Sequence, residues 1–320
     1  MLEKLCSKII KRKKRKISES EIFKTYELLL DRSPSFDEIA HWTAVGADST
    51  KISKELQQHY EFIQKQVNKL RVLIPLSEFK IFVMQNDLAV GAGIIKTKTF
   101  ESHVAKTIRD NLTPGGVFLD LGANIGFFTL LAASIVGRSG KVISIEPNVQ
   151  NLQLIYASIL ENNFENIRVY PFAVSDRPQI LNLTSFGSNG LVRPPSGNQL
   201  NSQFIQSIII DELLQNEERI DLIKIDIEGY EPLAFMGMTK LIQKHNPIII
   251  SEFNPWHIEH GAQVSPKSYL SKLSQNDYSL GIIEATGYIV SDLSIDFIMD
   301  YWMKIGNPQC NLDLIAYKKS

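Results

Sequence analysis

The chain has 320 residues, of which 44% are hydrophobic, and a formal net charge of −1. This length suggests about two domains, the apolar content is sufficient for a sizeable core, and the near-zero charge does not indicate a nucleic-acid or acidic-membrane partner. Two cysteines, Cys6 and Cys310, are too few for a disulfide framework or a metal cluster. No apolar run reaches the ~18 residues of a membrane span, and the basic start lacks the apolar segment of a signal peptide, so we expect a globular, cytoplasmic protein.

The first 70 residues differ in character from the rest of the chain. Residues 1–20 form a basic tail in which Lys11 to Lys16 are all basic. A solvated tail explains this run more simply than contact with anionic lipid or nucleic acid. Residues 21–70 are predicted to form a small helical module, with two amphipathic helices on either side of Ser33-Pro34 and then a polar linking helix. Residues 71–320 are expected to form the main domain.

The segment before the core is expected to contain a hairpin and a helix. Residues from Ser77 to Thr99 read as a pair of short strands with the turn at Asn86-Asp87. A helix is predicted in ESHVAKTIRDNL, where His103 is expected to be a surface or packing residue.

The stretch VFLDLGANIGF, from Val117 to Phe127, is expected to run from a buried strand through a tight loop into a helix. Gly122 and Gly126 suit an open backbone conformation or close ligand contact, and the helix start offers unpaired N–H groups. The spacing departs from the G-x-G-x-x-G of nicotinamide sites and lacks the lysine of a phosphate loop. The loop therefore favours a ligand without phosphate, such as S-adenosylmethionine, and Asp120 would suit the ammonium group of that cofactor.

The second apolar strand, in KVISIEPN, ends at Glu146. An acid at this position can bind both ribose hydroxyls of a nucleoside. Together with Asp120 and the glycine loop, Glu146 predicts S-adenosylmethionine binding, with another nucleotide or a purely structural turn as the alternatives. Strands and helices alternate up to about residue 174, which predicts an α/β fold with a parallel sheet.

The segment after FAVSD departs from this alternation. Between two strand-like stretches, residues 185–202 are rich in Gly, Pro, Ser and Asn and are expected to form a loop or flap. Asn189 and Arg193 in this loop are candidates for contact with a hydroxylated acceptor, although a plain loop explains them equally well. Asp211 is expected to cap the start of a helix.

DLIKIDIEGYE, residues 221–231, places charged residues at the end of an apolar strand. Strand alternation puts Lys224, Asp226 and Glu228 on one side. The carboxyl end of a strand in an open α/β sheet faces the ligand crevice, so both acids are candidate functional residues. The alternatives are a local ion pair between Lys224 and Glu228, or Glu228 as a helix cap. Glu252, at the tip of the strand in PIIISEFNP, is a third acid on the same rim.

The C-terminal part of the chain offers a weak metal pattern and the last strands. His257, Glu259 and His260 lie close in sequence, but no further ligand is recognisable, so no metal site is predicted there. YSLGIIEATGYIV and LDLIAYKK are expected to form the last strands.

Five segments in order, VFLDLGANIGFFTLLAA, VISIEPN, FAVSD, DLIKIDIEGYE and PIIISEFNP, resemble the FkbM family of S-adenosylmethionine-dependent O-methyltransferases. The resemblance covers roughly Gly91 to Tyr317. It implies a Rossmann-like class I methyltransferase fold, with a mostly parallel seven-stranded sheet and a reversed last strand, and activity on a hydroxyl of a glycan, sugar or related polyhydroxy metabolite. The matched motifs imply two groups of site residues. Cofactor binding is expected of Asp120, Gly122, Asn124, Gly126, Glu146 and Ala173, and catalysis of Asp226, Glu228 and Glu252.

Methyl transfer to a hydroxyl requires an aligned acceptor oxygen, exclusion of water and removal of a proton. Asp226 is the predicted general base, acting without a metal, and a divalent cation held by the same acids is the alternative. Nucleic-acid bases are not favoured as acceptors, because the motifs typical of base methyltransferases are missing. A nicotinamide oxidoreductase and a non-catalytic nucleotide-binding scaffold remain as alternatives from other functional classes.

Overall fold

The computed structural model describes residues 17–30, 32–58, 70–195, 203–275, 277–305, 307 and 310–318. The chain divides into two compact units, Met1–Arg71 and Val72–Ser320. The basic run from Lys11 to Lys16, Cys6 and much of the expected linking helix lie outside the described residues. None of the described helices combines the length and the apolar composition needed to cross a lipid bilayer.

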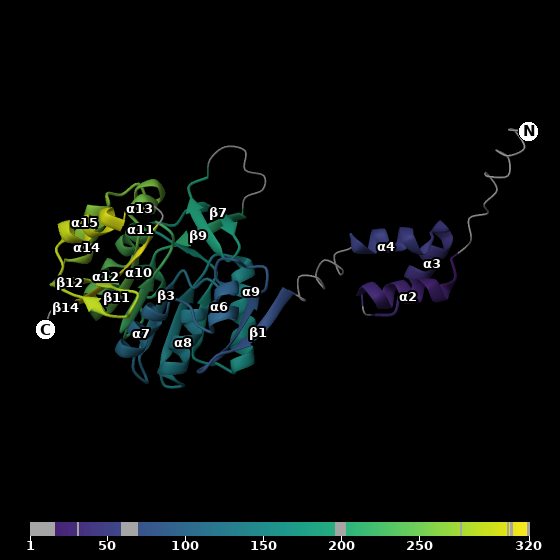
Figure 1. Ribbon diagram of the computed structural model, residues 1–320, viewed down its shortest axis with the longest axis horizontal. Coiled ribbons are helices and arrows are strands. Elements are labelled where there is room, and N and C mark those ends of the chain that lie inside the picture. Colours follow the sequence, from purple (N-terminus) through teal and green to yellow (C-terminus); the bar gives the residue numbers. More distant parts are fainter. Residues whose placement is uncertain are drawn as a thin grey trace, which may run out of the picture. The chain divides into compact units, whose positions relative to one another are not determined.

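The first unit is helical in its described part (Figure 1). Its helices are α2 (Glu19–Leu30), α3 (Phe36–Val45) and α4 (Ser49–Gln57). The helices expected on either side of Ser33-Pro34 are present as α2 and α3. A capping box starts α3, because the Ser35 hydroxyl accepts the Glu38 N–H and the Glu38 carboxylate accepts the Ser35 N–H at 2.7 Å.

Aromatic and charged side chains join α2 to α3. The Trp42 indole N–H donates to the Tyr26 hydroxyl at 2.9 Å, and both residues are buried. The Arg32 guanidinium lies 5.2 Å from the centre of the Tyr26 ring and donates to both carboxylate oxygens of Glu38, at 2.8 and 3.0 Å. α4 covers the start of the expected polar linking helix, and its two buried apolar residues, Ile52 and Leu56, pack in the same core.

The hydrogen bonds from Arg32 lower the pKa of Glu38 to about 2, although burial opposes ionisation. Because the folded-state pKa is depressed, the stability that ionised Glu38 contributes is complete above about pH 4.5 and is lost as the pH falls towards 2. We expect Glu38→Gln to destabilise this unit by roughly 1–2 kcal/mol at pH 7. The variant should also lose less stability than the wild type when the pH is lowered. Hydrogen exchange of the α3 backbone amides measures the effect.

Glu55→Gln is the matched control for that measurement. Glu55 is half-exposed, and its carboxylate lies 3.9 Å from the Lys51 ammonium, a geometry that contributes little to stability. Equal protection of α3 in the two variants would contradict the role assigned to Glu38.

The second unit is built on a sheet that, within the described residues, has eight strands in the order β13-β12-β14-β11-β10-β3-β4-β5 (Figure 1). The strands are β3 (Val117–Leu121), β4 (Lys141–Ile145), β5 (Ile167–Tyr170), β10 (Leu222–Ile225), β11 (Ile248–Phe253), β12 (Tyr278–Ile283), β13 (Ile289–Val290) and β14 (Leu312–Lys318). β14 runs antiparallel to both of its neighbours, and the strands from β11 to β5 are parallel. The expected parallel sheet with a reversed last strand is confirmed, and the two-residue β13 extends its edge.

Helices cover both faces of this sheet. One face packs against α6 (Gly91–Thr97), α7 (Ser102–Asn111), α8 (Phe127–Val136) and α9 (Val149–Asn162). The other face packs against α10 (Ile210–Leu213), α11 (Glu231–Met236), α12 (Thr239–His245), α13 (Pro255–Gly261), α14 (Pro266–Leu273) and α15 (Ile295–Ile305). Phe118 of β3 and Leu222 of β10 belong to the first face. Asp120 and Lys224 follow them by two residues, so strand alternation directs both charged side chains to the side of α7 and α8.

The segment before the core sheet, residues 71–97, differs from the expected hairpin. β1 (Arg71–Pro75) and β2 (Lys80–Met84) form a two-stranded sheet, so the chain reverses earlier than predicted. A turn is present at the expected place, where the Asp87 N–H donates to the Met84 carbonyl at 3.1 Å, but a helix, Gly91–Thr97, follows it instead of the expected strand. The Asp87 carboxylate accepts backbone N–H bonds at 3.1 and 2.9 Å from the residues leading into that helix.

A second sheet, β6-β9-β7-β8, follows β5 along the chain. Its strands are β6 (Ala173–Val174), β7 (Ile180–Phe186), β8 (Asn189–Arg193) and β9 (Gln203–Ile208). The expected loop is partly wrong, because residues 189–193 pair antiparallel with β7, while residues 196–202 lie outside the described residues. Leu183 and Val192 pack in one cluster with Tyr230, so one face of this sheet is turned towards the segment after β10.

Asp211 caps a helix, but not the one in which it lies. It is the second residue of α10, and its carboxylate accepts the backbone N–H groups of Lys240 and Leu241 at 3.0 and 2.8 Å. Asp211 therefore provides hydrogen-bond acceptors for backbone N–H groups in the first turn of α12.

Candidate active site

Two glycines shape the loop between β3 and α8. Gly122 and Gly126 have φ values of 82° and 92°, in the left-handed region that favours glycine. A Cβ on Gly122 would lie 1.9 Å from the backbone carbonyl oxygen of Asp226, so no larger residue fits there. The Asp226 N–H also donates to the Leu121 carbonyl at 3.0 Å. The glycine therefore lets the end of β3 and the end of β10 meet.

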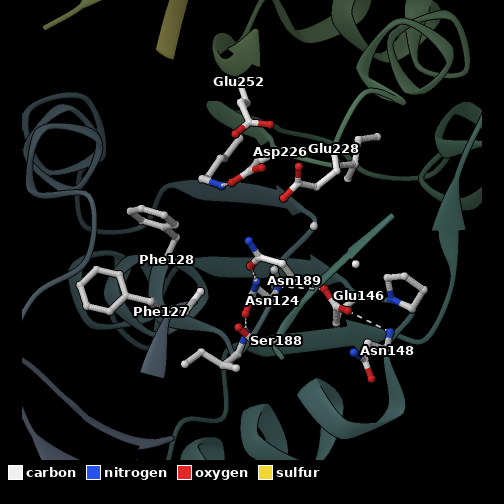
Figure 2. Close-up of a pocket in the computed structure, with 18 of the residues that line it drawn as sticks. Asn124, Phe127, Phe128, Glu146, Asn148, Ser188, Asn189, Asp226, Glu228 and Glu252 are labelled. Atoms are coloured by element: carbon white, nitrogen blue, oxygen red, sulfur yellow. Dashed lines mark hydrogen bonds and ion pairs between the residues drawn. The ribbon is translucent and has the colours of Figure 1, made fainter. Parts of the chain in front are cut away.

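A cavity of about 170 Å³ lies at the carboxyl ends of the parallel strands. One ordered water needs only ~10–15 Å³, so the space suits a ligand. Figure 2 shows Asp226, Glu228 and Glu252 together on one side of the cavity, with Glu146 and Asn148 apart from them. The predicted site residues that line it are Gly122, Asn124, Glu146, Asp226, Glu228 and Glu252. The structure does not bring Asp120, Gly126 or Ala173 into this lining.

Glu146 is held by the backbone around it. Its side chain accepts N–H bonds from Asn124 and Asn148, each at 2.8 Å, and from the Asn151 amide at 3.3 Å. A carboxylate has about four acceptor positions, so about one remains for a donor on the cavity side. Burial raises the pKa of Glu146 to about 7, and the two backbone N–H bonds oppose this shift.

A small apolar slot adjoins the glycine loop and Pro147. Ala173 lines it together with Phe172, Val174 and Tyr230. Its lining is apolar, as is usual where the edge of an aromatic base is bound. Ser188 lines the neighbouring cavity, and its hydroxyl oxygen is buried without a hydrogen-bond partner in the described part of the chain. A buried polar atom of this kind calls for a ligand or water partner, so these residues fit a nucleoside.

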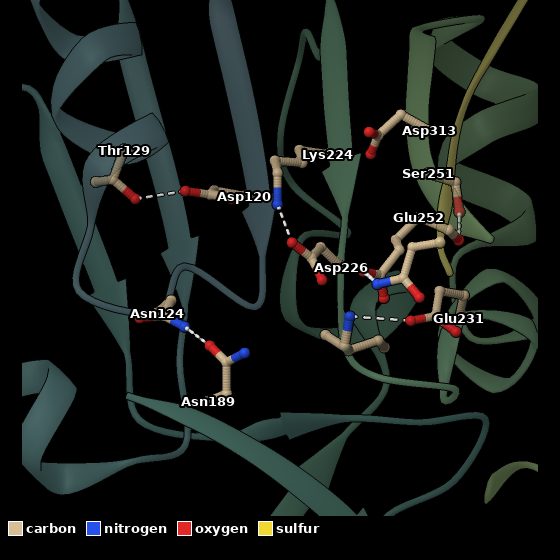
Figure 3. Close-up of polar contacts among 12 residues, drawn as sticks. Asp120, Asn124, Thr129, Asn189, Lys224, Asp226, Glu231, Ser251, Glu252 and Asp313 are labelled. Atoms are coloured by element: carbon tan, nitrogen blue, oxygen red, sulfur yellow. Dashed lines mark hydrogen bonds and ion pairs between the residues drawn. The ribbon is translucent and has the colours of Figure 1, made fainter. Parts of the chain in front are cut away.

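Asp120 lies beneath the cavity and not in its wall. Its side chain is fully buried, and Oδ2 accepts a bond from the Thr129 hydroxyl at 2.6 Å (Figure 3). Burial raises the pKa of Asp120, while the positive charge of Lys224 opposes the shift. Asp120 points under α8, so its predicted contact with a cofactor ammonium is not favoured by this placement.

Lys224 is a buried cation at the floor of the cavity. Its ammonium donates to Asp226 Oδ2 at 2.7 Å and lies 4.7 Å from the centre of the Phe128 ring. Burial opposes its charge, but Asp226, Glu101 and Asp120 together raise the pKa of Lys224. The ion pair considered from the sequence, with Glu228, is replaced by one with Asp226.

Glu228 lies on a turn and not on the strand. β10 ends at Ile225, and Glu228 has a left-handed φ of 55°, so the strand alternation used in the prediction stops before it. Its carboxylate lies 3.4 Å from His257 Nδ1. Glu231, which the sequence did not single out, holds this turn by accepting the Ile227 and Gly229 N–H groups at 3.0 Å.

Glu252 faces Asp226 from β11, the neighbouring strand. Burial raises the pKa of Glu252 well above its usual value, and the negative charges of Asp226 and Glu228 add to the shift. The Asn311 side chain, just before β14, donates to its Oε1. Glu252 is thus a candidate for a carboxyl group that holds a proton.

The histidines of α13 have structural neighbours. The His260 ring stacks on Trp256 with a centroid distance of 4.3 Å, and His257 lies beside Glu228. Among the described residues, no three His, Cys, Asp or Glu side chains are grouped so as to hold a metal ion.

Several cavity residues were missed from the sequence or placed differently. Asn189, a candidate acceptor contact, lines the cavity, and its Oδ1 accepts a bond from Asn124 at 2.9 Å. Arg193 does not line it, and its guanidinium donates to the Val192 carbonyl. Glu101 lines the cavity from a position before the core motifs, where no pattern pointed to it.

Comparison with known proteins identifies a family. A family model described as the methyltransferase FkbM domain matches residues 120–288, more than half of the chain. No curated protein matches the chain. A solved structure of methyltransferase FkbM from Methylobacillus flagellatus KT is 17% identical, covers 92% of this chain and 58% of that chain, and gives a TM-score of 0.41.

Two further solved structures are similar to this chain over a smaller part of its length. An O-methyltransferase from Bacillus cereus in complex with SAH is 13% identical, with 71% of this chain and 86% of that chain covered and a TM-score of 0.39. A precorrin-6y C5,15-methyltransferase from Geobacter metallireducens GS-15 is 11% identical, with 70% and 93% covered and a TM-score of 0.40.

The family match includes most of the segments that build the cavity. Residues 120–288 contain the glycine loop, Glu146 and the acids after β10 and on β11. The sheet order, with β14 reversed between β11 and β12, is that expected of a class I methyltransferase. The chain belongs to the FkbM methyltransferase family, and S-adenosylmethionine is the cofactor for its methyl transfer.

Proposed function

We propose that this protein is an O-methyltransferase acting on a hydroxyl of a glycan, sugar or related polyhydroxy metabolite. The observation that carries the proposal is that Asp226, Glu228 and Glu252 share one cavity with the glycine loop and Glu146. Carboxylates accept hydrogen bonds from hydroxyl groups, and one of them can remove the hydroxyl proton. Among the described lining residues, Lys224 is the one Lys or Arg, and Asp226 binds it, so the cavity offers little to an anionic acceptor.

The cofactor and the acceptor take different parts of this cavity. Bound S-adenosylmethionine supplies a methyl group on a positively charged sulfur. We assign one ribose hydroxyl to Glu146, the adenine to the slot lined by Ala173, and the neighbouring backbone contacts to Gly122 and Asn124. The acids of the β10 and β11 segments are then left for the acceptor.

Asp226 is the proposed general base. Lys224 holds one of its carboxylate oxygens at 2.7 Å and so fixes its orientation, and the acceptor proton passes to Asp226 as the new bond forms. Glu252, whose pKa burial raises, supplies a proton donor to a second acceptor oxygen. Glu228 remains a proposed contact to the acceptor.

We expect Glu146→Gln to weaken S-adenosylmethionine binding by roughly 1.5–3 kcal/mol, the range for charge-assisted hydrogen bonds. Isothermal titration calorimetry measures the affinity. Glu161→Gln on α9 is the control, because that carboxylate pairs with Lys80 at the surface. Equal affinity of the two variants would remove Glu146 from the binding site.

The acceptor class is tested by cofactor-dependent methylation of a panel of sugars, sugar nucleotides and lipid-linked glycans. We expect mass spectrometry to find the methyl group on a hydroxyl oxygen of at least one panel member. Methylation of nitrogen or carbon, or no transfer to any member by a protein that binds the cofactor, would contradict the proposal. The latter result would favour a binding scaffold.

With an acceptor from that panel, Asp226→Asn tests the base. The substitution keeps the shape and removes the charge, so turnover should fall by roughly 10² to 10⁴ while S-adenosylmethionine still binds. Full activity of the variant would exclude Asp226 as the base. Loss of wild-type activity to a chelator, with recovery on addition of Mg²⁺ or Mn²⁺, would replace the metal-free mechanism by a metal-assisted one.

A further inference from the structure

Glu101 lines the cavity, but the proposed division of the site gives it no role. It immediately precedes α7 and has a left-handed backbone, with φ 37° and ψ 64°, which is unfavourable for a residue with a side chain. It occupies the N-cap position of α7, yet its side chain makes no capping hydrogen bond. The helix therefore gains no side-chain cap from this conformation, which instead presents a carboxylate to the cavity.

The Glu101 carboxylate has no partner of its own. Within the residues that the structure describes, it makes no hydrogen bond and no ion pair. The charged groups that face it are Lys224 and Asp226 from the β10 segment, Asp313 from β14 and His103 from α7. Lys224 is bound to Asp226, and His103 Nε2 lies 2.6 Å from Asp313. Both basic side chains are therefore committed to other carboxylates.

The surroundings of Glu101 favour the arrival of a cation. Burial raises the pKa of Glu101 to about 7, and the negative charge of Asp226 adds to the shift, although Lys224 opposes it. A positive group placed beside such a carboxylate stabilises the ionised form and reverses the shift. Glu101 therefore has more to gain from a bound cation than an acid that is already paired.

Packing places Glu101 next to the glycine loop. Its neighbour Phe100 contacts Phe127 and Phe128, with ring centroids 6.0 and 5.9 Å apart, and these two residues begin α8 directly after the loop. Asp120, by contrast, is fully buried, accepts a bond from Thr129 and is outside the lining.

We propose that Glu101 is the counter-ion for the ammonium group of S-adenosylmethionine, in place of Asp120. The inference rests on the proposed assignment of the cavity to cofactor and acceptor. It adds a binding residue that lies before the segment matched by the family model.

Two cofactor relatives separate this role from a general effect on the site. S-adenosylhomocysteine carries the ammonium group, whereas 5′-methylthioadenosine has the same nucleoside without the amino-acid end. Glu101→Gln should weaken S-adenosylhomocysteine binding about 10- to 100-fold and leave 5′-methylthioadenosine binding unchanged within about twofold. Glu146→Gln should weaken both ligands alike, because they share the ribose.

The pH dependence gives a second readout. In the wild-type protein, the affinity ratio of S-adenosylhomocysteine to 5′-methylthioadenosine should rise between pH 6 and 8, because only ionised Glu101 pairs with the ammonium group. Glu146 titrates in the same range, but it affects both ligands and cancels in the ratio. The ratio should be constant in Glu101→Gln.

Several results would overturn the inference. These are unchanged S-adenosylhomocysteine binding by Glu101→Gln, an equal loss for both ligands, or a selective loss in Asp120→Asn alone. Retained 5′-methylthioadenosine binding shows that the variant is folded. A wild-type protein that binds neither ligand would instead refute the cofactor assignment itself, so the two failures are distinguishable.

Discussion

The close approach of the glycine loop to the end of β10 is the constraint on which the site depends. A side chain at Gly122 would collide with the Asp226 carbonyl, and the Asp226 N–H is bonded to the last residue of β3. Because β3 and β10 are neighbours in the sheet, this contact fixes two parts of the site relative to each other: the glycine loop, proposed to contact the cofactor, and Asp226, the proposed base. Methyl transfer depends on such alignment, since a small displacement of the reacting groups costs much of the rate. In the proposed mechanism, Gly122 therefore acts through geometry, by letting the two strand ends approach each other.

Strand register then gathers charge on one face of the sheet. Lys224 pairs in register with Asp120, and Glu252 pairs with Asp313 (Figure 3). All four point to the side of α7 and α8, where Glu101 lies before the first turn of α7. A buried ammonium is costly unless it is paired, and Lys224 is neutralised by the acids on either side of it. The ion pair with Lys224 takes up the carboxylate of Asp226. The other two acids on this side of the cavity, Glu101 and Glu252, have raised pKa values.

Local patterns predicted the parts of the fold that depend on neighbouring residues. The parallel core and the acids at the strand ends followed from alternation and from where each strand stops, whereas the reversed β14 was implied by the resemblance to the methyltransferase family. β8 was missed because its stability comes from pairing with β7, which composition does not reveal. Asp120 was read as a cavity residue because its motif ends a strand, but β3 is covered on both faces and the side chain points under α8. Glu101 carried no signal, since its role arises from the folding of α7 over β3 and β10.

The two ends of the cavity hold their carboxylates in different ways. Glu146 accepts two backbone N–H bonds that fix its position in the loops around it and oppose the rise of its pKa, which burial still brings to about 7. Glu252 is held by one side-chain amide, and Glu101 by none within the described residues. A carboxylate with backbone donors suits a permanent contact such as a ribose. A carboxylate without backbone donors suits contact with a charged or proton-transferring group of a ligand. Its protonation can change when that group binds beside it. The support that each acid receives from the backbone thus distinguishes Glu146, whose position the loops fix, from Glu252 and Glu101, whose carboxylates accept no backbone N–H bond within the described residues.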